Sequence, residues 1–232
     1  MLNFDLVIFD ADGTLWDYDA GERKALEAAL AAFGVPYDES VLQRYRSINS
    51  ELWRLLEQNV VNSDFVRVER FRKLLSELGI DMHPFDVQRV AADYLERLSA
   101  QAVPMKGAEE LLRLLSGRVR MAILTNGISA VQRSRFALSG FGRYINDLII
   151  SEEVGVAKPD PAVFVHCLNR LGCTRPERAL MVGDSIASDI RGGAAAGIVT
   201  CWFNPHGAPN LSDITPDYEI RRLSQLPELL GC

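Results

Sequence analysis

The stretch LVIFDADGTLWD, residues 6–17, places three carboxylates directly after a short apolar run. Four apolar residues in a row, at positions 6–9, are typical of a strand that is buried on both faces of a sheet. Asp10, Asp12 and Asp17 follow within eight positions and would repel one another where water is scarce. An Asp-Gly pair is also common in solvated turns, so the stretch by itself leaves a turn and a binding site open.

Four further apolar runs resemble the first and indicate the fold class. Each is short, apolar on both faces and followed by polar or turn residues. With the first run they lie at positions 6–9, 119–124, 148–150, 179–182 and 198–203. Helical patterns lie between the later runs, over 108–115, 161–171 and 188–196, and the Gly and Ala of the last permit close packing on a sheet. This alternation predicts an α/β fold with a doubly wound, Rossmann-like parallel sheet.

One connection in this pattern is far longer than the others. More than a hundred residues separate the first apolar run from Val119, whereas a crossover between parallel strands needs about a dozen. The segment 18–103 carries an apolar stripe at helical spacing and predicts several helices. The stripe consists of Val41, Leu42, Tyr45, Ile48, Leu52, Leu55 and Leu56. We therefore expect a core formed by residues 1–17 and 104–232, with residues 18–103 inserted as an α-helical domain.

Composition argues against several classes of protein. The chain has 232 residues, of which 48% are hydrophobic and 24% charged, as in globular proteins of one large domain or one domain with an insertion. The formal net charge of −6 argues against a nucleic-acid polymer as partner, because such binding calls for a basic surface. No stretch reaches the roughly 18 uninterrupted apolar residues of a membrane helix. The first residues do not resemble a signal peptide, so we expect a cytoplasmic protein that binds no membrane.

The four cysteines predict neither a disulfide framework nor a metal motif. The spacings of Cys167, Cys173, Cys201 and Cys232 match no zinc or redox pattern. We expect them to be reduced packing residues in a reducing compartment.

Polar residues follow the other apolar runs as well. Thr125 and Asn126 end the second run, and their hydroxyl and amide suit phosphate oxygens, although an Asn-Gly pair is also a common turn. Lys158 precedes a predicted helix and can neutralise a phosphoryl group or be an ordinary surface lysine. Asp184 follows the fourth run, and Asp189 five residues later can bind a cation through water or hold the loop by hydrogen bonds.

These clusters share one kind of position, the carboxyl end of a predicted strand, where doubly wound sheets bind their ligands. Asp10 and Asp12 are two apart on an extended segment, so their side chains can face one site. A carboxylate in such a site can bind a hard cation, attack as a nucleophile or transfer a proton. The clusters therefore predict one site with two or three carboxylates, one lysine and one threonine. The excess negative charge calls for a divalent cation, and Mg²⁺ is usual in phosphate chemistry.

As a set, the motifs resemble those of the haloacid dehalogenase-like phosphohydrolase superfamily, in the same order and across almost the whole chain. They are Asp10-Ala-Asp12-Gly-Thr14, Thr125-Asn126, Lys158-Pro159 and Gly183-Asp184 with Asp189. The resemblance implies a Mg²⁺-dependent phosphatase that works through an aspartyl-phosphate, and it implies that segment 18–103 is a C1-type cap. Dehalogenases of the same fold lack the second aspartate, so Asp12 favours phosphate transfer.

The resemblance also implies a role for each matching residue. Asp10 would attack phosphorus, Asp12 would protonate the leaving oxygen and then deprotonate the hydrolytic water, and Lys158 would offset the negative charge. These three are the implied catalytic residues. The implied phosphate-binding residues are Thr125, Asn126 and Lys158. The implied Mg²⁺ ligands are Asp10, Asp12 through its backbone carbonyl, Asp184 and, in support, Asp189.

Three further stretches resemble bacterial pyrimidine 5′-nucleotidases. They are ISEEVGVAKPD (150–160), VRVERF (66–71) and TCWFNPHG (200–207). This narrower resemblance implies a small phosphorylated substrate, a pyrimidine nucleoside 5′-monophosphate. A sugar phosphate or phosphoglycolate is an alternative substrate, and a phosphomutase would share the same chemistry. A non-enzymatic phospho-receiver combines the same residue types, but the paired acids of one loop and the large insertion argue against it.

Overall fold

The computed structural model describes residues 3–58, 60–81 and 83–231 and divides the chain into two compact units. The first unit is formed by the chain up to Tyr18 and from Ala102 onward, and the second by Asp19–Gln101. The first contains a β-sheet, and the second is helical. Within the described ranges, no helix combines the length and the apolar character that crossing a membrane requires.

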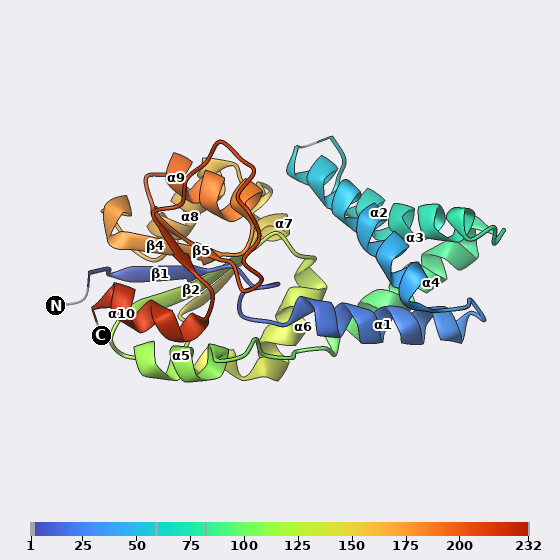
Figure 1. Cartoon of the computed structure of the whole chain (residues 1–232), viewed down its shortest axis with the longest axis horizontal. Helices are drawn as coiled ribbons and strands as arrows, with labels where there is room; N and C mark the ends of the chain where they lie inside the picture. Colours follow the sequence, from blue (N-terminus) through green and yellow to red (C-terminus); the bar gives the residue numbers. More distant parts are fainter. Residues whose placement is uncertain (1–2, 59, 82, 232) are drawn as a thin grey trace. The chain divides into compact units, whose positions relative to one another are not determined.

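Six parallel strands form the sheet of the first unit, in the order β3-β2-β1-β4-β5-β6 (Figure 1). The strands are β1 (Leu6–Phe9), β2 (Arg120–Thr125), β3 (Asp147–Ile150), β4 (Ala179–Gly183), β5 (Val199–Phe203) and β6 (Tyr218–Ile220). β1 lies between β2 and β4, and its Phe9 pairs with Ile123 on one side and Val182 on the other. This order is the doubly wound arrangement, so the predicted α/β fold is confirmed, with β1 to β5 at the five apolar runs.

Helices cover both faces of the sheet, because its strands are apolar on both faces. Val7 and Phe9 of β1 point into one core, and Leu6 and Ile8 point into the other. The helices of this unit are α5 (Ala108–Leu115), α6 (Ser129–Ser139), α7 (Ser151–Val154), α8 (Pro161–Arg170), α9 (Arg191–Ala195) and α10 (Leu226–Leu230). α5 and α10 contribute to the first core and α8 to the second, on opposite sides of the sheet in Figure 1. Each fully buried large apolar side chain contributes about 1.5–3 kcal/mol.

The segment expected to be one helix over 188–196 is built differently. A π-helical turn, Ile186–Ile190, precedes the short α9, and the Ile190 amide donates to the Ser185 carbonyl oxygen at 3.2 Å. The predicted close packing is present, because a Cβ atom on Gly192 would lie 2.3 Å from a ring carbon of Phe164. Only glycine therefore lets α9 approach α8 at this point.

The cysteines of the described chain are packing residues. Cys167, Cys173 and Cys201 are buried with free thiols. Burial raises the pKa of the Cys167 and Cys201 thiols to about 12, so both stay protonated near neutral pH. The expectation for Cys232 falls outside the described residues.

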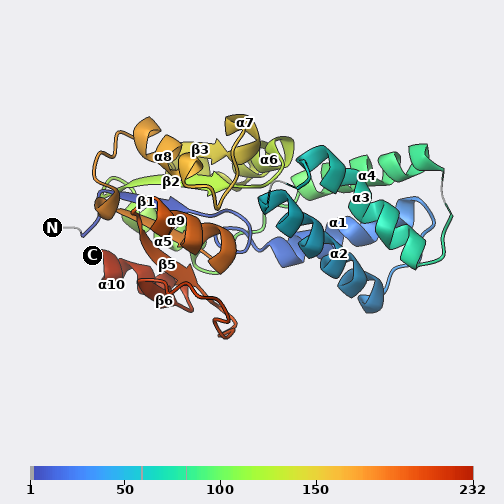
Figure 2. The same cartoon turned by 90° about the horizontal axis from the view of Figure 1, so that it is seen from above.

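Among the described residues of the second unit there are four helices (Figure 2). They are α1 (Tyr18–Ala32), α2 (Glu39–Glu57), α3 (Ser63–Glu77) and α4 (Pro84–Ser99). α3 contacts both α2 and α4, and rings from the three helices, Tyr45, Phe71 and Tyr94, meet with centroids 5.2–5.6 Å apart. Asp38 caps α2 and Asn62 caps α3, because each side chain accepts a backbone N–H of the first turn. The predicted stripe is buried from Val41 to Leu52 and half-buried at Leu55 and Leu56.

Candidate active site

The site residues of the first unit gather at the carboxyl ends of its central strands. Asp10 follows β1 directly, and its amide donates to the Val182 carbonyl oxygen of the neighbouring β4 at 2.8 Å. Thr125 is the last residue of β2, and Asp184 is the first residue after β4. Because these strands are parallel and adjacent, their ends meet at one edge of the sheet, as the sequence predicts.

Lys158 is the centre of the cluster. Its ammonium nitrogen Nζ lies 2.5 Å from Asp10 Oδ1, 2.7 Å from Asp189 Oδ1 and 2.9 Å from the Leu124 carbonyl oxygen. The side chain is 2% exposed, and these contacts use all three of its donors. Burial by itself lowers the pKa of Lys158, but attraction to Asp10 and Asp189 outweighs it, so the pKa lies above the ordinary value. Lys158 is therefore a fixed positive charge.

Asn126 positions that lysine through its side chain. Its amide nitrogen donates to the Lys158 carbonyl oxygen at 2.8 Å, and its amide oxygen accepts the Lys158 backbone N–H at 2.8 Å. The side-chain amide of Asn126 thus bonds both the N–H and the carbonyl oxygen of Lys158, as a neighbouring strand would, and holds the loop that carries the lysine. Thr125 Oγ1 accepts the Gly127 N–H at 3.0 Å, so its own hydroxyl proton can be donated elsewhere.

Three carboxylates form a cation-sized cluster beside the lysine. One oxygen each of Asp10, Asp184 and Asp189 lies within 4.8 Å of the others. Burial raises the pKa of Asp10 well above its usual range, Lys158 opposes that rise, and the neighbouring acids add to it. Asp184 is the one residue of the three that is exposed to solvent as a whole. Its carboxyl group has nevertheless lost hydration, and this loss, followed by repulsion from Asp189, raises the pKa of Asp184 to about 7. Three carboxylates against one ammonium leave two negative charges, which suits a divalent cation with oxygen ligands.

Asp189 accepts hydrogen bonds from two other parts of the cluster. It is fully buried, its Oδ1 accepts Lys158, and its Oδ2 accepts the Ser185 N–H at 3.1 Å. Asp189 thus holds both the loop and the lysine by hydrogen bonds, and it also belongs to the carboxylate cluster that could hold a cation. A Cβ atom on Gly183 would lie 2.2 Å from Asp189 Oδ2, so glycine is required for this approach.

Gly13 brings the first acidic loop against the last. Its φ of 82° lies in the left-handed region, and a Cβ atom there would lie 2.6 Å from Asp184 Oδ2. The Thr14 hydroxyl lies 3.4 Å from Asp184 Oδ1. The Asp184 carbonyl oxygen accepts the indole N–H of Trp202 at 2.9 Å, which fixes this residue from β5.

Asp12 has partners that the sequence did not reveal. Gln132 Nε2 donates to Asp12 Oδ2 at 2.6 Å, and Arg135 Nη1 donates to Asp12 Oδ1. Both donors lie on the buried face of α6, three residues apart. The helix SAVQRSRFALS is too polar to predict which face is buried, so only their spacing was available as a signal. Asp12 is also close enough for its charge to contribute to the raised pKa of Asp184.

The comparison with protein families identifies the chain. The model of the haloacid dehalogenase-like hydrolases matches residues 4–197. The chain belongs to that family. It is 32% identical over 229 residues to the pyrimidine 5′-nucleotidase YjjG of Escherichia coli (strain K12), covering 99% of both chains. It is 34% identical over 228 residues to the pyrimidine 5′-nucleotidase PynA of Streptococcus pneumoniae (strain ATCC BAA-255 / R6), covering 98% of this chain and 95% of that one.

A solved relative extends this likeness to three dimensions. The HAD-hydrolase YfnB of Bacillus subtilis, in a magnesium-bound crystal structure, superposes with a TM-score of 0.92 at 33% identity, covering 99% of each chain. The fold, the motifs at the strand ends and the relatives agree, so this member of the family is a phosphatase that hydrolyses phosphoric monoesters.

Proposed function

We propose that the chain is a Mg²⁺-dependent 5′-nucleotidase that hydrolyses pyrimidine nucleoside 5′-monophosphates. The observation that carries the phosphatase chemistry is the contact of one buried ammonium, Lys158, with Asp10 beside two further carboxylates. The substrate class rests on the likeness, over almost the full chain, to two proteins named pyrimidine 5′-nucleotidases. The helical unit Asp19–Gln101 would be the C1-type cap that selects the substrate.

In the first step, Asp10 attacks the phosphorus atom of the monoester. A bond forms between its carboxylate oxygen and phosphorus, and the bond from phosphorus to the ester oxygen breaks. The leaving oxygen takes its proton from the carboxylic acid of Asp12. Lys158, held 2.5 Å from Asp10 Oδ1, offsets the charge of the carboxylate and of the phosphoryl group that it meets.

In the second step, water releases the phosphate. The Asp12 carboxylate takes a proton from that water, whose oxygen attacks phosphorus, and the bond between phosphorus and Asp10 breaks to restore the free carboxylate. The Thr125 hydroxyl and the Asn126 backbone N–H would donate hydrogen bonds to the phosphoryl oxygens during both steps. Most of the work is positioning and charge stabilisation.

The donor set fits Mg²⁺, because the carboxylates supply hard oxygen atoms and carry excess negative charge. Asp10, the Asp12 backbone carbonyl and Asp184 would hold the ion, and Asp189 would support it through the lysine and the loop. When bound, Mg²⁺ would neutralise charge on the phosphoryl oxygens.

A phosphate-release panel tests the proposal. With Mg²⁺ present, dUMP, TMP and UMP are compared with purine monophosphates, sugar phosphates and phosphoglycolate. We expect the highest kcat/KM for the pyrimidine nucleotides and loss of release in EDTA. Preference for a sugar phosphate would reject the nucleotide proposal and leave the phosphatase intact, whereas full activity in EDTA would reject the metal.

A further inference from the structure

We propose that Gln132 and Arg135 are positioning residues that hold the Asp12 carboxylate in the orientation needed for its two proton transfers. This inference rests on the proposed role of Asp12 and extends the site to α6. Each carboxylate oxygen has its own donor, Nε2 of Gln132 on Oδ2 and Nη1 of Arg135 on Oδ1. Two donors from one rigid helix fix the plane of the carboxylate, which a single hydrogen bond would let rotate.

The carboxylate stays reachable while it is held. The Asp12 side chain is 26% exposed, whereas that of Arg135 is 0% exposed. A carboxylate oxygen can accept more than one hydrogen bond, so the side of Asp12 that faces solvent remains available for a leaving oxygen or a water. This arrangement suits a carboxyl group that exchanges protons with the substrate on its exposed side while Gln132 and Arg135 hold it on the other.

The two donors are themselves fixed. A Cβ atom on Gly127 would lie 2.1 Å from Gln132 Nε2, so the glycine beside Asn126 makes room for the amide. The Arg135 guanidinium lies 4.8 Å from the ring centroid of Trp16, a buried side chain on the Asp12 loop. Gln132 also keeps a buried amide oxygen that has no hydrogen-bond partner in the described structure. Packing alone would favour an apolar residue at position 132, so the glutamine is best explained by the hydrogen bond that its amide nitrogen donates to Asp12.

Two substrates with different leaving groups can distinguish positioning of Asp12 from general support of the fold. A nucleoside leaves as an alkoxide and needs the Asp12 proton, whereas p-nitrophenolate leaves readily without one. Release of the phosphate from Asp10 needs Asp12 as base for either substrate. Misorienting Asp12 therefore slows both steps for a nucleotide but mainly the second step for p-nitrophenyl phosphate.

The test uses Gln132→Met and Arg135→Lys in the full chain, with Arg133→Lys as matched control on the exposed face of α6. For TMP we expect kcat to fall at least tenfold with KM changed less than threefold, within the range of general acid–base catalysis. For p-nitrophenyl phosphate we expect a burst of one nitrophenolate per active site before slow turnover. Arg133→Lys should match the wild-type protein.

Two results would overturn the positioning role. One is a folded Gln132→Met or Arg135→Lys protein with wild-type kinetics on both substrates. The other is an equal loss on both substrates without a burst, which indicates general loss of the active fold. Because p-nitrophenyl phosphate reports any monoesterase, failure of the nucleotide proposal would not disturb this test.

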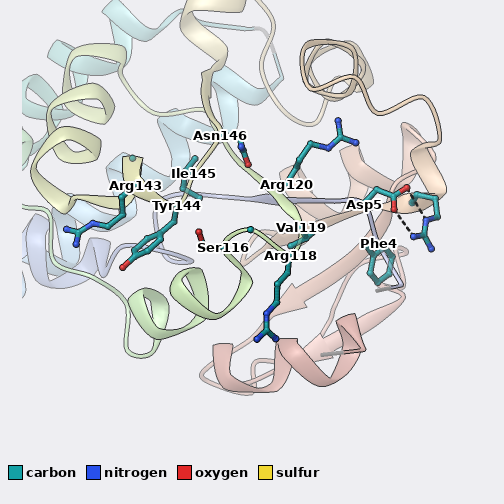
Figure 3. A pocket seen from close by; sticks show the side chains of 13 residues that line it. Phe4, Asp5, Ser116, Arg118, Val119, Arg120, Arg143, Tyr144, Ile145 and Asn146 are labelled. Carbon is teal, nitrogen blue, oxygen red and sulfur yellow. Dashed lines mark hydrogen bonds and ion pairs between the residues drawn. The ribbon is translucent and has the colours of Figure 1, made fainter. Parts of the chain in front are cut away.

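A different observation carries a second inference, at the opposite edge of the same sheet. A cavity of about 950 Å³ lies where the strands begin, lined by residues that precede or start β1, β2, β3 and β4 (Figure 3). Four arginines line it, Arg118, Arg120, Arg143 and Arg178, together with one acid, Asp5. We infer that this cavity, here called the arginine groove, binds a small anion that carries two or more phosphate groups.

The charge of the arginine groove is poorly compensated within the chain. Asp5 pairs with Arg178 at 2.7 Å, and the hydrogen bond from Arg178 lowers the pKa of that carboxyl. Among the described residues, Arg118, Arg120 and Arg143 have no carboxylate within ion-pair distance. Arg120 donates instead to the Leu171 carbonyl oxygen and also attracts Asp5, and Arg143 donates to the Gly140 carbonyl oxygen at 2.8 Å. Three arginines besides Arg178 thus line one cavity of a protein whose formal net charge is −6, and their side chains extend from it in different directions (Figure 3). Such a concentration against the overall charge favours an anionic ligand.

The geometry of the groups favours phosphate. A guanidinium binds a phosphate through two parallel hydrogen bonds, and guanidinium groups that are spread along one cavity suit a chain of phosphates better than a single phosphate. Asn146 and Ser116 add polar side chains to the lining, and the Tyr144 ring lies 5.5 Å below the Arg143 guanidinium. The volume falls in the range of small-molecule sites, about 300–1,000 Å³.

Calorimetric titration of the full chain with inorganic tripolyphosphate in EDTA tests the arginine groove. We expect saturable binding that weakens at least tenfold in Arg118→Gln/Arg143→Gln and is unchanged in Arg113→Gln, an exposed arginine of α5 outside the groove. Absence of saturable binding, or equal affinity in all three proteins, would overturn the inference. Orthophosphate binding as tightly as tripolyphosphate would reject the multiply phosphorylated ligand.

Discussion

Replacing Lys158 by methionine should destabilise the metal-free protein strongly, because it removes the only cation in contact with Asp10 and Asp189 in the described structure. Methionine keeps the length of the side chain and removes its charge. One oxygen of each carboxylate lies within 4.8 Å of the other, and two unit charges at that separation or less repel by at least about 3.5 kcal/mol at an effective dielectric constant of about 20. This agrees with the roughly 3–5 kcal/mol measured when a buried ion pair loses one partner. For a chain of this length, it corresponds to a fall in Tm of roughly 7–14 °C.

The assay is thermal unfolding in EDTA, so that no cation replaces the lysine, at pH 5 and pH 8. The pKa of Asp10 is already raised, so at pH 5 the carboxyl groups of the variant take up protons and repulsion is relieved. The gap in Tm between wild type and variant should therefore widen from pH 5 to pH 8. Lys106→Met, at an exposed lysine, should change stability by less than about 0.5 kcal/mol. A Lys158→Met protein as stable as wild type at pH 8 would show that Lys158 does not offset repulsion between Asp10 and Asp189.

Three further perturbations test other parts of the site. The pKa of Asp184 is raised from 3.8 to about 7, so the metal-free protein should lose stability as the pH rises between these values. Mg²⁺ should therefore raise Tm more at pH 8 than at pH 5. Equal increases in Tm at the two pH values would contradict this. Gly13→Ala should lower phosphatase activity more than tenfold, because the added Cβ atom meets the Asp184 carboxylate. The control is Gly107→Ala, where φ is 85° and no atom lies within 4 Å of the added Cβ. That variant carries only the backbone strain and should stay active. Asn126→Ala removes two hydrogen bonds from the backbone of Lys158, so it should lower the free energy of unfolding by about 1–3 kcal/mol and also lower kcat. An unchanged free energy of unfolding and an unchanged kcat would argue against a positioning role of Asn126.

The parts of the fold that the sequence predicts are those with a strong local pattern. The five apolar runs are strands because both faces of a covered parallel sheet must be apolar. β6 could not be predicted, because Tyr218–Ile220 has three residues of which two are exposed, and its pairing with β5 comes from tertiary contact. The segment 188–196 has a helical pattern, but periodicity cannot distinguish a π-helical turn from the first turn of an α-helix.

The candidate site was predictable to the extent that its residues lie at strand ends. Asp10, Thr125 and Asp184 are near one another because parallel strands end at one edge, which the order of the motifs already implies. The partners of Asp12 were not predictable, since Gln132 and Arg135 on a polar helix read as surface residues until the buried face is known. The contacts of Asp189 were likewise undetermined, because hydrogen bonding and metal binding call for the same carboxylate.

Trapping the covalent intermediate on Asp10 tests the assigned nucleophile most directly. The full chain with Mg²⁺ is mixed with a radiolabelled monoester substrate, quenched in acid during turnover and digested, and the labelled peptide is sequenced. We expect acid-stable label on the peptide that contains Asp10, and none when Asp10→Asn is used. Label on any other residue, or normal turnover by Asp10→Asn, would contradict the assignment of Asp10 as the nucleophile.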